Sequence, residues 1–321
     1  MGTPLVSIIV LNWNGESLIE ECVRSLKNTQ ADNFEVVVVD NASNDHSLEL
    51  LGRFEGIKLV KNSTNLGFAK GNNQGFGLAR GKYVATVNND AVVEPSWLNA
   101  PLALLEADDT IGIISCRQMN YFDREKIDVL FSYPSRFLLL QRMGHGEVFG
   151  NNPLHFRKGL VIGASGAAVV YRKKMLEEID GFEESFFAYH EETDLFFRAF
   201  LAGWKCVYVP SSVVYHKGSA SFGSMKKTFC YYHERNRIWF IYRNFPLGYI
   251  IVNFPSILFR ETRTLVKAIL MGNLGALWAA RIDGFREMFR FSSIRAKNIA
   301  EFRKKKIEYL RFLREKVIPV A

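Results

Sequence analysis

Carboxylate and amide side chains follow three apolar runs of the chain directly. Asn12, Asp40 and the run Asn88-Asn89-Asp90 each stand at the end of a short, β-branched segment. Mg²⁺ bound to a diphosphate needs only one or two protein carboxylates, because phosphate and water complete its shell. Polar residues that begin a loop are also common turn formers. On its own, the Asn-Asn-Asp run therefore fits a polar turn and a metal-diphosphate site equally well.

A second acidic segment, Glu191-Glu192-Thr193-Asp194, opens a stretch whose apolar residues recur at helical spacing. A carboxylate held at such a place can take the proton of a reacting hydroxyl group. Acidic residues at a helix N-terminus also stabilise the helix through its macrodipole. The segment alone leaves both interpretations open.

The elements that must position these residues alternate between strand and helix over residues 5–116. Apolar runs at 6–11, 35–39, 57–60, 83–87 and 111–115 are separated by segments with helical character. This rhythm predicts an α/β fold with a mostly parallel central sheet and helices on both faces. Ligands of such sheets bind beyond the carboxyl ends of the strands, where the polar residues stand. The stretches 159–171, 205–209 and 213–216 are expected as further strands.

Several classes of protein are disfavoured. The glycine-rich segment at 65–75 lacks both G-x-G-x-x-G and the P-loop pattern, which argues against a dehydrogenase and a P-loop enzyme. A nucleotidyltransferase would carry a glycine- and arginine-rich loop where Asn12-Trp13-Asn14-Gly15 stands. The four cysteines are scattered without a C-x-x-C pair, which indicates a reducing compartment. The apolar run at 5–11 is expected to be a buried strand and not a secretory signal.

Charge divides the chain into two regions. Residues 223–321 hold 20 Lys and Arg against 7 Asp and Glu, a balance of +13, whereas residues 1–222 hold 21 against 26, a balance of −5. We therefore predict a domain at 1–222 and a basic, mainly helical region at 223–321. Apolar runs interleave with the basic residues, which favours an anionic membrane surface over nucleic acid. No transmembrane helix is expected, because the run 245–259 is short and contains prolines.

Seven segments in this order resemble one known family. They are VSIIVLNWNG, VVVVDNASND, NLGFAKGNNQG, TVNNDAVVEP, GASGAAVVYRK, GFEESFFAYHEETDLFFRAFLAGWK and YHKGSAS. The set resembles the family 2 glycosyltransferases of the GT-A fold, particularly their rhamnosyltransferase-like members. The resemblance covers residues 5 to about 222 and is specific for the superfamily, not for the sugar.

The resemblance implies a role for each matching residue. The donor nucleotide would be bound by nine residues: Asn12, Asn14, Asp40, Ser43, Gly67, Phe68, Asn72, Asn88 and Asn89. The metal would be bound by Asp90, the one carboxylate that remains of the family's D-x-D motif, and by His216. The acceptor or sugar would contact Ser165, Gly166 and Asp194.

Glu192 would be the general base, with Glu191 as the alternative. The family usually has aspartate where Glu192 stands, so the carboxylate is displaced here by about 1.5 Å, on the scale that affects rates.

The function implied is inverting transfer of a sugar from dTDP-rhamnose or a UDP-sugar to a glycan or lipid-linked glycan, with Mg²⁺ or Mn²⁺ as cofactor. Such an enzyme would serve polysaccharide biosynthesis for the cell envelope, in the cytoplasm and peripherally at the inner face of the membrane. A second hypothesis is a binding or scaffold protein that retains the GT-A fold without catalysis, since the Asn-Asn-Asp motif and the base are altered. Release of nucleoside diphosphate distinguishes the two.

Overall fold

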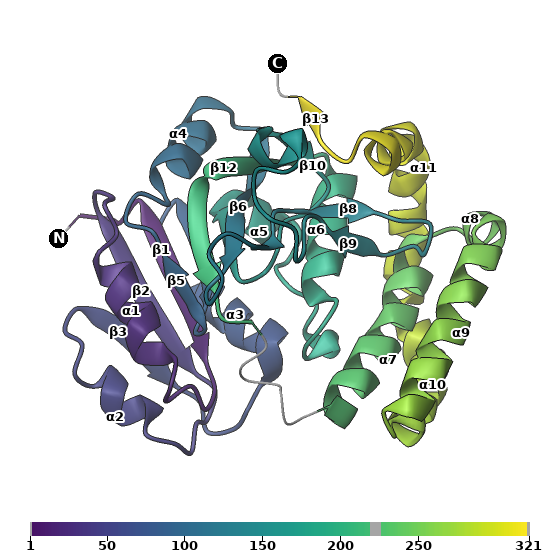
Figure 1. Ribbon diagram of the computed structural model, residues 1–321, viewed down its shortest axis with the longest axis horizontal. Helices are drawn as coiled ribbons and strands as arrows, with labels where there is room; N and C mark the ends of the chain where they lie inside the picture. The colour runs from purple at the N-terminus through teal and green to yellow at the C-terminus, as the bar shows by residue number, and fades with distance from the viewer. Residues whose placement is uncertain (1, 219–225, 320–321) are drawn as a thin grey trace.

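The computed structural model describes residues 2–218 and 226–319. Eleven strands of the described residues form one sheet, in which the order β13-β10-β12-β6-β11-β4-β1-β2-β3 is extended by β5 on β12 and β7 on β6. Figure 1 shows this sheet at the centre of the molecule. The strands are β1 (Val6–Asn12), β2 (Phe34–Asp40), β3 (Ile57–Lys61), β4 (Tyr83–Asn88), β5 (Ala91–Val93), β6 (Ile111–Asn120), β7 (Ile127–Val129), β10 (Gly159–Val161), β11 (Ala168–Arg172), β12 (Lys205–His216) and β13 (Ile318–Pro319). A separate hairpin pairs β8 (Ser132–Pro134) with β9 (Leu140–Arg142).

The direction of the strands decides where the polar residues meet. Strands β3, β2, β1 and β4 are parallel to their neighbours, and β6 is parallel to β12. Between these two groups lies β11, antiparallel to both β4 and β6. The carboxyl ends of β1, β2, β4, β6 and β12 and the start of β11 therefore share one edge of the sheet.

Helices cover both faces of the sheet, as expected for an α/β fold. Helices α1 (Ile19–Lys27), α2 (Ser47–Leu51) and α4 (Asn99–Ala107) pack on one face. Helices α3 (Gly67–Leu78), α5 (Lys173–Glu178) and α6 (Glu191–Ala202) pack on the other. Short 3-10 turns lie at Pro153–Phe156, Glu184–Phe186 and Met288–Phe291. The predicted fold class is confirmed, with the antiparallel β11 inserted into the mainly parallel arrangement.

Two expected strand segments are organised differently. The stretch 159–171 is not one strand, because β10 pairs with β12 whereas β11 lies between β4 and β6. The stretches 205–209 and 213–216 are one strand, β12, with an irregularity between Val209 and Val213. Sequence periodicity could not distinguish a break from a bulge, since both interrupt the alternation of side chains.

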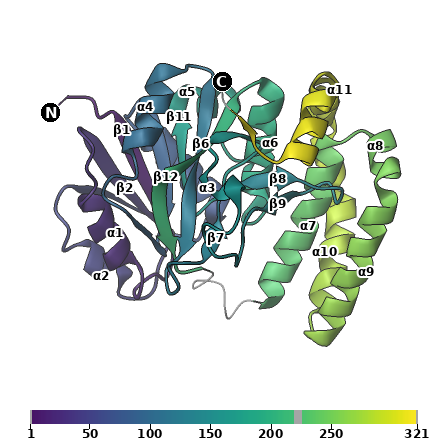
Figure 2. The same ribbon diagram turned by 45° about the horizontal axis from the view of Figure 1, so that its top comes forward.

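The C-terminal region is helical, as predicted. It comprises α7 (Lys226–Asn244), α8 (Leu247–Val252), α9 (Phe254–Leu270), α10 (Leu274–Glu287) and α11 (Ser292–Glu315). Aromatic residues of α7 and α11 pack on α6 and form a third core around Phe197. Figures 1 and 2 show α8, α9 and α10 beyond α7, at the edge of the molecule. No helix within the described ranges combines the length and apolar composition needed to cross a bilayer. The predicted boundary at 222/223 lies outside the described residues.

Candidate functional site

Four polar residues from neighbouring strand ends form one hydrogen-bonded network. Asn12 donates from Nδ2 to Asp40 Oδ1 at 2.9 Å and to Ser43 Oγ at 3.2 Å, and it accepts at Oδ1 from Asn89 at 2.9 Å. Asp40 also accepts from the Ser43 hydroxyl and amide. Asn12, Asp40 and Asn89 are buried. These three side chains therefore form the buried layer of the site, because their hydrogen bonds connect the ends of β1, β2 and β4.

The accessible part of this network is formed by other residues. Asn14 is exposed, and its backbone has φ of 49°. Its amide donates to Ser43 Oγ at 2.9 Å, and its Oδ1 accepts from Asn44 at 2.9 Å. Ser43 and Asn88 are half-buried. Asn14, Ser43 and Asn88 are thus the predicted donor-binding residues that a ligand at this edge can reach directly.

Gly67, Phe68 and Asn72 lie at the start of α3, where the backbone contacts the segment before α6. The amides of Phe68 and Ala69 donate to the carbonyl of Phe187 at 2.6 and 3.2 Å. Gly67 has φ of +81°, and a Cβ there would lie 2.5 Å from the Phe187 ring, so only glycine fits both the backbone and the contact. Asn72 is buried and donates to the Phe68 carbonyl at 3.0 Å. These contacts therefore connect the start of α3 to the segment before α6, on two sides of the site.

Asp90 and His216 approach one another across the sheet edge. His216 Nε2 lies 3.2 Å from Asp90 Oδ1, and His216 Nδ1 lies 2.7 Å from Asp128 Oδ2. The register explains the approach, since His216 of β12 is paired with Ala91, the residue after Asp90. Although burial opposes the charged form, hydrogen bonds to Asp128 and Asp90 raise the pKa of His216 to about 10. His216 therefore lies between two carboxylates, Asp90 at Nε2 and Asp128 at Nδ1.

These donors suit a divalent cation. The described residues contain no group of three His, Cys, Asp or Glu side chains arranged to hold a metal ion. One carboxylate and one imidazole nitrogen nevertheless converge at Asp90 and His216, and a carboxylate on the second ring nitrogen is the usual support of a metal-binding histidine. A cation that also binds a diphosphate and water needs few protein ligands. A cation would displace the proton that His216 Nε2 shares with Asp90, after which these residues could hold Mg²⁺ or Mn²⁺ jointly with the substrate.

Glu192 lies against the loop that precedes β11. A Cβ on Gly166 would lie only 1.4 Å from Glu192 Oε1, so the carboxylate occupies the space that glycine leaves. Burial raises the pKa of Glu192 to about 7, opposed by the charge of His216. No hydrogen bond links this carboxylate to another described residue. Two hydrogen bonds hold this loop against Gln118 of β6. Ser165 Oγ donates to Gln118 Oε1 at 2.8 Å, and Gln118 Nε2 donates to the Ser165 carbonyl at 2.6 Å.

Glu191 has a different environment from Glu192. It is buried, and its Oε2 has no hydrogen-bond partner among the described residues. Burial and the neighbouring Glu192 raise the pKa of Glu191 well above its usual range. Such a carboxyl group ionises less readily than one in water. Of the two candidates for a base, Glu192 has the more accessible carboxylate.

The segment before α6 is held in an unusual conformation. Phe187, Tyr189 and His190 have φ of 64°, 69° and 68°, in the left-handed region that residues with a Cβ seldom adopt. The side chain of Asn236, buried in α7, lies 2.8 Å from the carbonyls of Phe186, Ala188 and Tyr189. Such strain persists only where surrounding contacts enforce it. Helix α7 therefore helps to determine where Glu191 and Glu192 begin α6.

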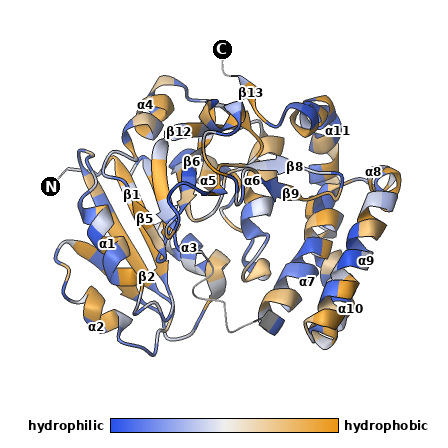
Figure 3. Cartoon of the chain, viewed as in Figure 1, coloured by the Kyte–Doolittle hydropathy of each residue, from blue (hydrophilic) through white to orange (hydrophobic). Residues whose placement is uncertain are grey.

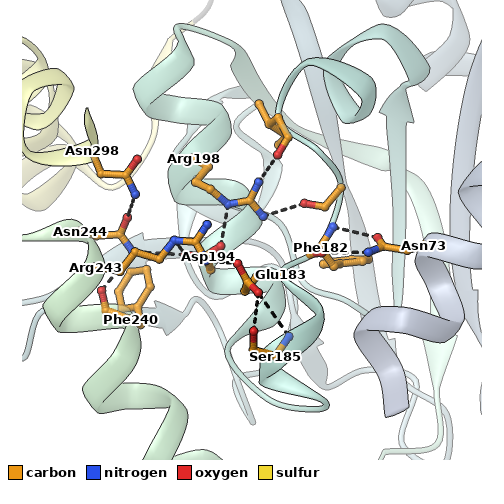
Figure 4. A network of polar contacts seen from close by, with 12 residues as sticks. Asn73, Phe182, Glu183, Ser185, Asp194, Arg198, Phe240, Arg243, Asn244 and Asn298 are labelled. Atoms are coloured by element: carbon orange, nitrogen blue, oxygen red, sulfur yellow. Dashed lines mark hydrogen bonds and ion pairs between the residues drawn. The ribbon is translucent and has the colours of Figure 1, made fainter. Parts of the chain in front are cut away.

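Asp194 does not lie where the predicted acceptor contact requires. It is wholly buried, and its carboxylate is ion-paired with Arg198 at 2.6 Å and with Arg243 at 3.4 Å. Asn244 donates to the same carboxylate at 3.3 Å and accepts from Asn298, so the network joins α6, α7 and α11 (Figure 4). With arginines at both oxygens, Asp194 has a structural position. Gly166, by contrast, borders Glu192, and Ser165 precedes it in the same loop.

Comparison of the sequence with known proteins identifies the family of this chain. The model of "Glycosyl transferase family 2" matches residues 7–180. The chain belongs to glycosyl transferase family 2. An uncharacterized glycosyltransferase of Haemophilus influenzae is 37% identical over 112 residues, which is 34% of this chain and 35% of that protein. The family 2 chain thus matches about a third of that relative's length.

Solved structures support the GT-A fold of this family 2 glycosyltransferase. S. aureus TarS 1-349 in complex with UDP-GlcNAc has a TM-score of 0.59 at 19% identity, covering 95% of this chain and 91% of that one. The mannosyltransferase PcManGT from Pyrobaculum calidifontis, in complex with GDP-Man and Mn²⁺, has a TM-score of 0.54 at 19% identity, covering 97% and 87%. At these identities the likeness concerns the fold.

Three residues at the family 2 site were not identified from the sequence. Asp128 lies in the irregular stretch after residue 120, where the only signal is its place between the buried Ile127 and Val129. Gln118 is a buried polar residue near the end of β6. Asn236 is within a helix, and nothing local indicates its contacts. The residues Ser219–Ser221 of the seventh motif lie outside the described part of the chain.

Proposed function

We propose that this family 2 glycosyltransferase moves a sugar from a nucleotide-sugar donor to an acceptor hydroxyl with inversion at the anomeric carbon. The main support is the convergence at one sheet edge of the Asp90–His216 pair and the Glu192 carboxylate. Chemistry at this edge needs one group that takes a proton and one charge that offsets the departing diphosphate. The Glu192 carboxylate can take the proton, and Asp90 and His216 could hold the cation that supplies the charge, in a chain that belongs to a transferase family.

Glu192 is the general base of the proposed reaction. Its carboxylate is half-buried beside Gly166, and its pKa of about 7 suits proton transfer near neutral pH. The acceptor hydroxyl would lose its proton to Glu192 while its oxygen bonds to the anomeric carbon and the bond to the diphosphate oxygen breaks. A single carboxylate in this role is consistent with direct displacement, which inverts the configuration.

Asp90 and His216 would hold Mg²⁺ or Mn²⁺. When bound, the cation would offset the negative charge of the leaving nucleoside diphosphate. Asn14, Ser43 and Asn88 line the accessible edge beside these residues, and we assign them to the donor nucleotide. Asn12, Asp40 and Asn89 support that edge from beneath, since their side chains are bonded to one another.

The donor is a nucleotide-sugar, and UDP-sugars and dTDP-rhamnose are the first to test. The structural relatives TarS and PcManGT were solved with UDP-GlcNAc and with GDP-Man, so both nucleotides belong in the same screen. The acceptor we propose is a glycan or lipid-linked glycan of the cell envelope. Transfer would take place on the cytoplasmic side of the membrane, where nucleotide-sugars are made and cysteines remain reduced.

Release of nucleoside diphosphate tests the proposal. Purified protein is screened with nucleotide-sugars and Mn²⁺ by thermal shift, since a bound donor raises apparent stability. The preferred donor is then used for turnover. Asp90→Ala should weaken binding of donor with Mn²⁺, and Glu192→Gln should abolish release while leaving that binding intact. Unaltered turnover in either variant refutes the role given to that residue. Donor binding without release, with every acceptor supplied, would instead favour a non-catalytic binding protein.

A further inference from the structure

Exposed apolar residues of this protein are concentrated in one segment. Of the 21 large hydrophobic residues that are exposed within the described chain, 16 lie between Leu247 and Phe289, in α8, α9, α10 and the residues just after α9 and α10. Figure 3 shows hydrophobic stretches along these helices at the edge of the molecule. Scattered exposed hydrophobics are normal in a folded protein, but a concentration of this kind marks an interaction surface.

Helix α10 is apolar on two opposite faces. Its inner face packs on α7 through the buried residues Leu277, Ala280 and Gly284, and Trp239 of α7 donates to the Gly284 carbonyl at 3.1 Å. Its outer face carries Leu274, Trp278, Ile282 and Phe285, followed by Phe289 beyond its end. These five side chains are 37–62% exposed and follow one another at spacings of three or four residues. The outer face of a surface helix in a soluble protein is usually polar. This stripe is apolar, and the described part of the chain leaves it exposed.

Helix α9 has the reverse of the usual amphipathic arrangement. Its inward positions include Arg260 and Glu261, which belong to an ion-pair cluster with Glu234 of α7 and Arg281 of α10. Its outward positions include Leu258, Phe259, Val266, Ile269 and Leu270, all exposed.

The ion pairs fix the rotation of α9. Arg260 lies 3.0 Å from Glu234, and Glu234 is buried. Because a buried charge is costly without its partner, α9 cannot turn its apolar face inward without breaking this cluster. The apolar outer face is thus built into the fold.

The charges on this outer surface have one sign. Between residues 245 and 290, every exposed charged residue is basic: Arg263, Lys267, Arg286 and Arg290. The acidic residues of the same segment are half-buried: Glu261 pairs with Arg281, while Asp283 and Glu287 lie 3.7 and 3.4 Å from Arg286 and Arg290 and leave those two arginines exposed. Apolar and aromatic side chains flanked by basic ones are typical of helices that lie in the interface of an anionic membrane.

We infer that the outer face of α8, α9 and α10 binds the surface of a membrane that contains anionic lipids. The helices would lie in the plane of the bilayer, with Trp278, Phe285 and Phe289 among the headgroups and Arg286 and Arg290 at lipid phosphates. A second copy of the chain fits this surface less well, because a symmetric pairing would oppose like charges. The inference uses none of the proposed donor or catalytic residues and is independent of the proposed transfer.

Vesicle sedimentation tests the inference with the full-length protein. One set of vesicles contains phosphatidylcholine alone, and the other contains phosphatidylcholine with phosphatidylglycerol. We expect binding to the anionic vesicles that weakens with added salt. The double variant Trp278→Ser/Phe285→Ser should lose at least about tenfold in partitioning, because it removes two large apolar anchors. Both side chains are exposed, at 55% and 56%, so the variant should fold normally, which circular dichroism and its melting temperature would verify.

Matched variants separate this surface from other apolar or basic parts of the chain. Ile307→Ser removes a residue that is 83% exposed on α11, next to the basic run 303–306, and should leave binding unchanged. Arg286→Gln/Arg290→Gln should weaken binding to anionic vesicles and reduce its dependence on salt.

Three outcomes overturn the inference. The first is that the wild-type protein sediments with anionic vesicles no more than it does without them. The second is that Ile307→Ser loses binding whereas the double variant retains it. The third is that the protein is a dimer in solution and the double variant is a monomer. The last outcome would assign the surface to a second copy.

Discussion

Replacing Gly166 by alanine tests the position of the proposed base without altering the base itself. The new methyl group would lie 1.4 Å from Glu192 Oε1, 2.0 Å from Cδ and 2.1 Å from Oε2. The backbone at Gly166 does not have a positive φ, so alanine is compatible with the local conformation. The substitution therefore acts on the Glu192 carboxylate, which must leave its place.

The size of the effect follows from the displacement. Ordinary contact with a Cβ begins near 3.4 Å, so the carboxylate must retreat by about 2 Å. A misplacement of about 1 Å can lower a rate by about 10²-fold. We therefore expect kcat to fall by at least about 10²-fold, which corresponds to about 2.7 kcal/mol in activation free energy. Stability should change little, because the displaced group is the flexible end of a half-buried side chain.

Release of nucleoside diphosphate measures the loss, and donor binding with Mn²⁺ serves as the internal control. Gly77→Ala is the matched variant, since a Cβ at Gly77 in α3 would meet nothing within 4 Å. It should retain full activity. Turnover of Gly166→Ala within about twofold of the wild type would refute the reasoning, since a 10²-fold loss is expected.

Three further predictions concern the metal support, the pH profile and the core. Asp128→Asn should weaken Mn²⁺ binding by about 10- to 100-fold, because it removes the carboxylate that orients His216. Asp123→Asn, which removes a carboxylate from a surface ion pair, should leave Mn²⁺ binding unchanged. Calorimetric titration with nucleoside diphosphate present measures both affinities. The rate of transfer should rise as pH increases through about 7 and then level off, because burial raises the pKa of Glu192 and only its deprotonated form accepts the proton; Glu192→Gln should lack this step in a pH–rate profile. Asp194→Ala should reduce the free energy of unfolding by about 3–5 kcal/mol, because it removes the carboxylate paired with buried Arg198 and one of the two paired with buried Arg243. Denaturant titration measures the loss, and a change under about 1 kcal/mol would contradict the ion-pair assignment.

The sequence by itself determined most of the sheet and the place of the site along the chain. Alternating apolar and helical segments predict the parallel strands, and the polar residues after β1, β2 and β4 lie together at one edge as expected. Such features can be predicted because they depend on local periodicity and on the rule that parallel strands end at the same edge. The order of motifs similarly indicated the family that the comparison shows.

The tertiary structure alone decided which of these residues a ligand can reach. Asp194 shares a motif with Glu192, yet one is wholly buried between arginines of α6 and α7 and the other borders Gly166. Their environments depend on α7, about 50 residues away in the sequence. Asp128 reaches His216 across 88 positions of sequence. Contacts over such separations are set by how the sheet and helices pack, and no local pattern of residue types encodes them.

The same reasoning applies to the C-terminal region. Its basic and apolar composition favoured a membrane surface, whereas the structure shows that some of its apolar residues are packed and others are exposed. Helices α7 and α11 are packed on the core through their aromatic residues, whereas α9 and α10 keep apolar faces outward. The composition of a segment gives the number of its apolar residues, but it does not show which of them face the core and which face solvent. That distinction arises from the rotation of each helix, which the buried ion pairs of α9 and the small inner residues of α10 determine.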